Sequence, residues 1–107
     1  MYKNINKKEI LELKELVQYQ EGQVVSKTLV QNELVSVTIF SFDKNEEIST
    51  HASGGDAMVT VIEGKGKFTI SGQDYYLEAG QTIIMPKDEP HSVYGEEKFK
   101  MLLVVSF

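Results

Sequence analysis

The sequence predicts a single all-β domain, a barrel or sandwich, preceded by one short helix. Apolar and polar residues alternate over 35–40, a pattern typical of a strand with one buried face. Further short apolar segments follow, and turn residues separate them at intervals of about 8 to 12 positions, as in sandwiches and barrels. Apolar residues recur at helical spacing only near the N-terminus. The length of 107 residues corresponds to one domain, 1–107.

The expected helix covers residues 7–17, within an N-terminal segment, 1–22, that we expect to pack on the barrel. Asn6 precedes this helix, and Glu9 follows three positions later, as in a capping box. The apolar positions that share one helical face are Ile10, Leu13 and Val17.

Strands are expected from about residue 23 to the C-terminus. Residues 57–62 and 66–70 are predicted to form a hairpin around Gly64 and Lys65. Ser71, Gly72 and Gln73 form the next predicted turn. The remaining strands are expected near 35–40, 75–78, 82–85 and 99–107.

The last of these strands lacks alternation. Residues 101–105 are all apolar, whereas a half-exposed antiparallel strand alternates between apolar and polar residues. We therefore expect both of its faces to be covered. One face would meet the core, and the other would meet the N-terminal helix or a second subunit. The sequence thus favours a homodimer.

Composition excludes several classes of partner. The net charge is −5 and the chain has no arginine, so nucleic-acid binding is not expected. No apolar segment approaches the roughly 18 residues that span a membrane, so no membrane partner is expected. The absence of cysteine excludes disulfides and thiolate metal sites. The N-terminus has no apolar signal-peptide core, which favours a cytoplasmic location.

The chain contains two histidines, and each lies in a segment with characteristic spacing. His51 is followed by Gly64 at the end of the first segment, and the second segment contains Gly80, Pro86 and His91. These residues and their spacing resemble the two signature motifs of the cupin superfamily. The resemblance extends over about residues 35–107 and implies a cupin double-stranded β-helix, that is, a jelly-roll barrel.

In cupins the motif histidines face into the barrel and can hold a metal. Ser53 replaces the second histidine of the first motif, and the acidic position falls on Ala57 or Met58. The resemblance therefore implies a depleted site with His51 and His91 as the metal ligands. Asp56 is the one carboxylate nearby, and the thioether of Met58 suits Cu(I) better than harder ions. The pocket residues that the resemblance implies are His51, Ser53, Ala57, Met58 and His91.

Three functions remain open. The barrel holds a small polar molecule, with at most one weakly bound divalent transition metal such as Zn, Mn, Ni or Fe. Alternatively, the chain is a metal-dependent cupin enzyme, an isomerase or dioxygenase acting on a small organic acid or sugar. The third function is a dimeric structural or regulatory module with a filled barrel. The histidines can equally be satisfied by hydrogen bonds, without any metal.

Overall fold

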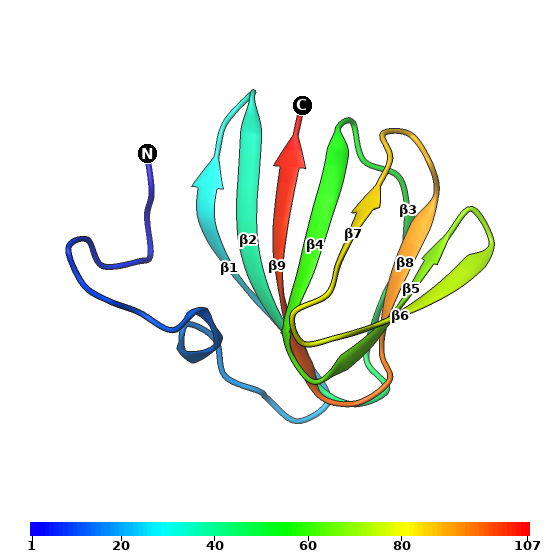
Figure 1. Cartoon of the computed structure of the whole chain (residues 1–107), viewed down its shortest axis with the longest axis horizontal. Helices are drawn as coiled ribbons and strands as arrows, with labels where there is room; N and C mark the ends of the chain where they lie inside the picture. The colour runs from blue at the N-terminus through cyan, green and yellow to red at the C-terminus, as the bar shows by residue number, and fades with distance from the viewer.

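Two antiparallel sheets form the protein in a computed structural model that describes residues 1–107 (Figure 1). The five-stranded sheet has the order β1-β2-β9-β4-β7, and the four-stranded sheet has the order β3-β8-β5-β6. This architecture confirms the all-β prediction and is that of a jelly roll. The strands are β1 (Val24–Gln31), β2 (Val35–Phe42), β3 (Glu47–His51), β4 (Asp56–Glu63), β5 (Lys65–Ile70), β6 (Gln73–Glu78), β7 (Thr82–Met85), β8 (His91–Gly95) and β9 (Phe99–Ser106).

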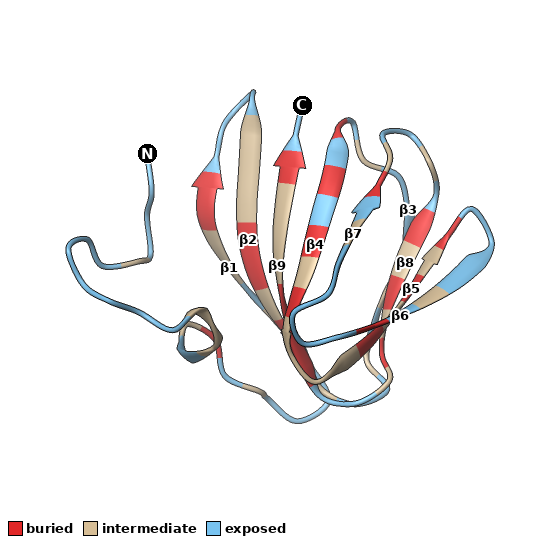
Figure 2. Cartoon of the chain, viewed as in Figure 1, coloured by how far each residue is buried: buried red, intermediate tan, exposed pale blue.

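An aromatic cluster fills one end of the space between the sheets. Phe42, Phe68 and Phe99 are fully buried, and the Phe42 and Phe99 rings stack with their centroids 4.5 Å apart. Phe68 meets Phe99 edge to face at 6.0 Å. In Figure 2 the buried positions recur along strands of both sheets. Because Phe99 begins β9, the later residues of that strand line the other end of the barrel.

The predicted N-terminal helix is wrong, and only a 3-10 turn, η1 (Leu13–Glu15), forms within 7–17. Lys8 has a φ of 61°, which a right-handed helix does not allow. Ile10 is fully exposed, so the apolar face of such a helix would have little to pack against. A helix this short is marginal in water without tertiary contacts.

A polar cluster attaches the end of this N-terminal segment to the barrel. Lys100 is buried in β9, and its Nζ donates to the carbonyl oxygen of Lys14 at 2.6 Å. The Tyr19 hydroxyl donates to Glu63 at 2.5 Å. Burial, reinforced by this hydrogen bond to the carboxylate, raises the pKa of Tyr19. Val17, which lies between Lys14 and Tyr19 in the sequence, is buried. Residues 14–19 therefore anchor the N-terminal segment to the barrel.

The predicted hairpin around Gly64 is also wrong. β4 pairs with β7 and β9, whereas β5 pairs with β6 and β8, so the two strands belong to different sheets. Gly64 is therefore the corner at which the chain passes from one sheet to the other, with a φ of +76°. The turn predicted at Ser71 and Gly72 does form, and it joins β5 to β6 in a true hairpin.

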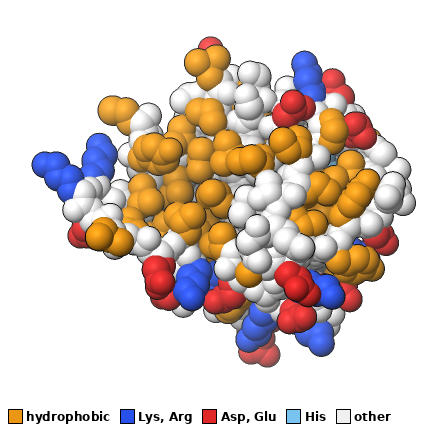
Figure 3. All heavy atoms as spheres, viewed as in Figure 1, with side chains coloured by type: hydrophobic (Ala, Val, Ile, Leu, Met, Phe, Trp, Pro, Cys, Tyr) orange, Lys and Arg blue, Asp and Glu red, His pale blue; other side chains and the backbone are white.

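β9 lies at the centre of the five-stranded sheet, between β2 and β4. Met101, Leu103 and Val105 face the other sheet, as expected for one covered face. Leu102 and Val104 alternate with them and point outward. Figure 3 shows apolar side chains gathered on this side of the molecule. The structure contains no helix with the length and hydrophobicity of a membrane-spanning segment.

Candidate functional site

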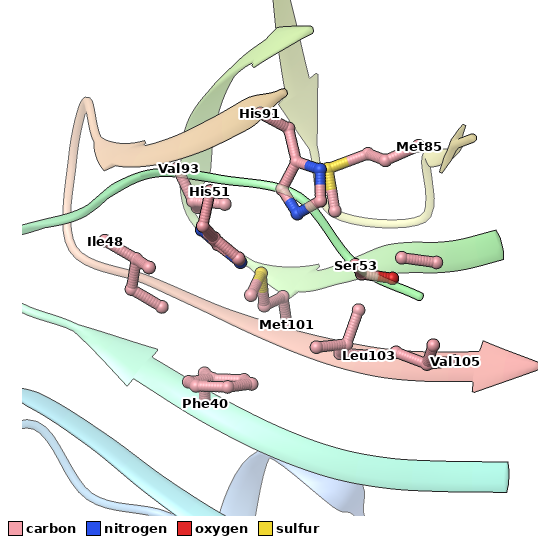
Figure 4. A pocket seen from close by; sticks show the side chains of 11 residues that line it. Phe40, Ile48, His51, Ser53, Met85, His91, Val93, Met101, Leu103 and Val105 are labelled. Carbon is pink, nitrogen blue, oxygen red and sulfur yellow. The ribbon is translucent and has the colours of Figure 1, made fainter. Parts of the chain in front are cut away.

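A cavity of about 130 Å³ lies between the sheets, and Figure 4 shows its lining. Eight of the eleven residues that line it are hydrophobic. The cavity therefore offers a mainly apolar interior with a few polar groups, which is the usual composition of a small-molecule site. Its lining is Phe40, Ile48, His51, Ser53, Ala57, Met85, His91, Val93, Met101, Leu103 and Val105.

The two histidines meet across neighbouring strands. His51 ends β3, His91 begins β8, and the two residues are direct partners in the antiparallel ladder. Their ring centroids are 4.4 Å apart, at an interplanar angle of 68°. Ile48 also lines the cavity, although residues three apart on a regular strand point to opposite faces. An irregularity in the pairing between Ile48 and His51 allows both side chains to face inward.

Backbone carbonyl groups orient both rings in the same way. Nδ1 of His51 lies 2.9 Å from the carbonyl oxygen of Ser49, and Nδ1 of His91 lies 3.1 Å from that of Glu89. A carbonyl oxygen only accepts hydrogen bonds, so Nδ1 carries the proton in each neutral ring. Nε2 of each ring is consequently left with a lone pair, available to a ligand or a metal.

The two rings differ in exposure. His91 is 3% exposed, whereas His51 is exposed at the open end of the cavity. Burial lowers the pKa of His91, the hydrogen bond to Glu89 partly opposes this effect, and the charge of protonated His51 lowers the pKa further. His91 is therefore neutral at pH 7, with its Nε2 lone pair free.

The lowered pKa of His91 predicts a pH dependence of stability in the metal-free protein. Between the folded pKa and the unfolded value of about 6.5, the unfolded state binds more protons, so stability falls as the pH drops through this window. Urea unfolding at pH 7.5, 6.5 and 5.5 measures the loss. His91→Asn keeps a donor near Glu89 but cannot titrate, so its curve should be flatter. His51→Asn should retain most of the decrease in the free energy of unfolding between pH 7.5 and 5.5. A decrease for His91→Asn as large as that of the wild type would contradict the assignment of this pH dependence to His91.

Two further residues expected in the pocket do line it. Ala57 is buried and faces the cavity from β4. Ser53 also lines the cavity, but its hydroxyl donates to the carbonyl oxygen of Gly55 at 2.6 Å. Met58, also expected in the pocket, does not line the cavity. It follows Ala57 on β4 and therefore points to the outer face, where it is 39% exposed.

Asp56 also lies outside the cavity. Its Oδ1 accepts a hydrogen bond from the backbone N–H of Lys87 at 2.8 Å, so the carboxylate braces a loop. No group of three or more His, Cys, Asp or Glu side chains converges anywhere in the structure. With Ser53 engaged and Ala57 lacking a donor atom, the residues present do not fit a divalent metal site with three or four protein ligands.

The sequence reasoning missed two sulfur-containing residues of the cavity. Met85 ends β7 and Met101 lies in β9, and both side chains are buried and line the same cavity as the histidines. The unbroken apolar stretch of β9 gives no indication of which alternate set faces inward. Met85 lies next to Pro86 of the second motif, and this proximity was the one available signal.

The family model described as a cupin domain matches residues 38–106. A conserved protein of unknown function from Streptococcus pyogenes is 44% identical, with a TM-score of 0.96, over 98% of this chain and 92% of that chain. A cupin superfamily protein from Desulfitobacterium hafniense is 28% identical, with a TM-score of 0.95, over 100% and 98%. A cupin 2 conserved barrel domain protein from Leptotrichia buccalis is 42% identical, with a TM-score of 0.89, over 91% of this chain and 47% of that chain. No curated protein matches the chain.

Proposed function

The chain belongs to the cupin family, and we propose that its barrel binds a small, largely apolar molecule carrying a hydrogen-bond donor at one end. The observation that supports this proposal is the pair of unprotonated Nε2 atoms beside an apolar cavity. Two adjacent acceptors suit a hydroxyl or N–H group. The sequence predicted a polar ligand. Because the cavity lining is mostly apolar, we restrict the polar group of the ligand to the end that meets the two histidines.

The size and charge of the cavity restrict the ligand further. An engineered apolar cavity of about 150 Å³ in another protein holds benzene, so about 130 Å³ corresponds to one small ring or a short branched chain. No lysine lines the cavity, and a bound anion would lose its hydration without gaining a cationic partner. A neutral phenol or alcohol therefore fits better than a carboxylate.

Methionine methyl groups provide a direct test of this ligand class. Four methionines are present, of which Met85 and Met101 line the cavity while Met1 and Met58 lie outside it. Adding phenol to protein labelled with ¹³C at the methionine methyls should shift the Met85 and Met101 signals saturably. The Met1 and Met58 signals should stay in place, and benzoate should shift none of the four.

A pair of neighbouring substitutions controls this experiment. Leu103→Phe adds volume on the cavity side of β9 and should weaken phenol binding about tenfold or more. Leu102→Phe adds the same volume on the outer side of the same strand and should leave binding unchanged. Equal shifts of all four methionine signals, or equal binding by both variants, would contradict a ligand site in the barrel.

We also propose that two copies of the chain associate through the outer face of the five-stranded sheet. Strand pairing places four outward apolar residues in one row across it, from β2 through β9 and β4 to β7. The last of them, Ile84, is 54% exposed. The row contains no charged side chain, so two copies with a net charge of −5 can meet there with little repulsion. Its members are Val37, Val104, Met58 and Ile84.

A further inference from the structure

We propose that the barrel cavity is a Cu(I) site, with His51, His91 and Met101 as ligands and Met85 as an additional sulfur donor. This inference goes beyond the proposed function, because it assigns a metal to the same cavity, where the ion and the small molecule compete for the two Nε2 atoms. It rests on two histidines and two methionines that line one cavity of about 130 Å³. Thioether sulfur and imidazole nitrogen together are a donor set that suits Cu(I).

The nitrogen donors are already oriented for a metal. Each ring is fixed by a hydrogen bond from Nδ1 to the carbonyl oxygen two residues before it, at Ser49 and at Glu89. Histidines that bind metals usually make such a bond with the ring nitrogen that does not bind the metal. The ring centroids lie 4.4 Å apart, so the two imidazoles are neighbours in the cavity, and we place one ion between their Nε2 atoms.

The sulfur donors line the same cavity as the rings. Figure 4 shows the His91 ring and the Met101 side chain both reaching into the cavity that the His51 ring also lines. The Met85 side chain extends toward His91 from the opposite wall. Methionine has three rotatable bonds, so each sulfur can adjust its position without moving a strand.

The charge of the ion separates copper(I) from the divalent metals. No carboxylate lines the cavity, so a bound cation has no neutralising charge among the residues around it. The Born cost of burying an ion scales with the square of its charge, so a monovalent ion costs about one quarter as much as a divalent ion of equal radius. Neutral soft donors in an apolar enclosure therefore select Cu(I) over Zn²⁺ or Mn²⁺.

Anaerobic titration of the untagged protein with Cu(I), in competition with bicinchoninate, tests the site. The wild type should bind one Cu(I) per chain. Met101→Leu and Met85→Leu conserve side-chain volume and should leave the fold intact. Met101→Leu should weaken Cu(I) binding about tenfold or more, and the double variant further still, while zinc affinity measured with a dye stays within about threefold. X-ray absorption of the copper-loaded wild type should show sulfur neighbours that the double variant lacks.

Met58→Leu is the matched control, because Met58 is exposed on the outer face of β4. Its Cu(I) affinity should equal that of the wild type. The inference is overturned if the wild type does not compete for Cu(I), if the double variant binds as tightly as the wild type, or if Met58→Leu loses as much affinity. If the protein does not bind Cu(I) but phenol still shifts the Met85 and Met101 signals, the copper site is contradicted and the proposed small-molecule function is still supported.

Discussion

Gly64→Ala should destabilise the protein by about 3 kcal/mol or more, a large share of the roughly 5–15 kcal/mol that stabilises a domain. Gly64 has a φ of +76°, which costs an alanine about 1–2 kcal/mol. An added Cβ would also overlap the carbonyl oxygen of Lys98 and lie 2.8 Å from Cα and Cβ of Phe99. These are mainly backbone atoms beside a fully buried ring, so they cannot move aside cheaply.

Gly72→Ala separates the strain of the backbone from the steric clash. Gly72 also has a positive φ, +83°, but a Cβ there would meet no atom within 4 Å. It should therefore lose only about 1–2 kcal/mol in urea unfolding, from the backbone term alone. Equal losses for the two variants would show that the close approach at the corner carries no energetic weight.

The sequence was sufficient to predict the fold class and the placement of the two histidines side by side. The alternation in 35–40 and the two histidine segments led to an all-β barrel, and the family match over 38–106 agrees with the resemblance. His51 and His91 are 40 positions apart, yet they are direct ladder partners. The motif spacing predicts this contact because proteins that share the two motifs share the backbone fold that brings the histidines together. The secondary-structure propensity of each segment does not say which strands pair.

The errors arise where the outcome depends on tertiary contacts. The apolar spacing of 7–17 is helical, but Ile10 has nothing to pack against and no stable helix forms. Gly64 suits a hairpin turn and a corner between sheets equally well, and only the pairing of β4 with β9 distinguishes them. In the same way, the continuous apolar stretch of β9 concealed that Met101 faces the cavity.

Val104→Lys should convert a wild-type dimer into a monomer in sedimentation velocity experiments. Val104 lies mid-row on the outer face of the five-stranded sheet, between its ladder partners Val37 and Met58. A stable interface buries roughly 800 Å² per partner, so a lysine at its centre would be desolvated without an anion beside it. In a twofold dimer every substitution occurs twice, so the dissociation constant of the dimer should rise by about a hundredfold or more. Leu102→Lys, on the same face, should act in the same direction.

Tyr76→Lys is the control for this experiment. Tyr76 is 53% exposed on β6, an edge strand of the other sheet. The Tyr76→Lys substitution therefore adds the same charge away from the proposed interface. The Tyr76→Lys protein should remain a dimer, because a surface lysine is hydrated and costs little. All variants should keep the wild-type circular dichroism spectrum, since Val104 is not fully buried within one chain. A wild type that sediments as a monomer at every concentration, or a dimer that tolerates both Val104→Lys and Leu102→Lys, would mean that this apolar face does not join two copies.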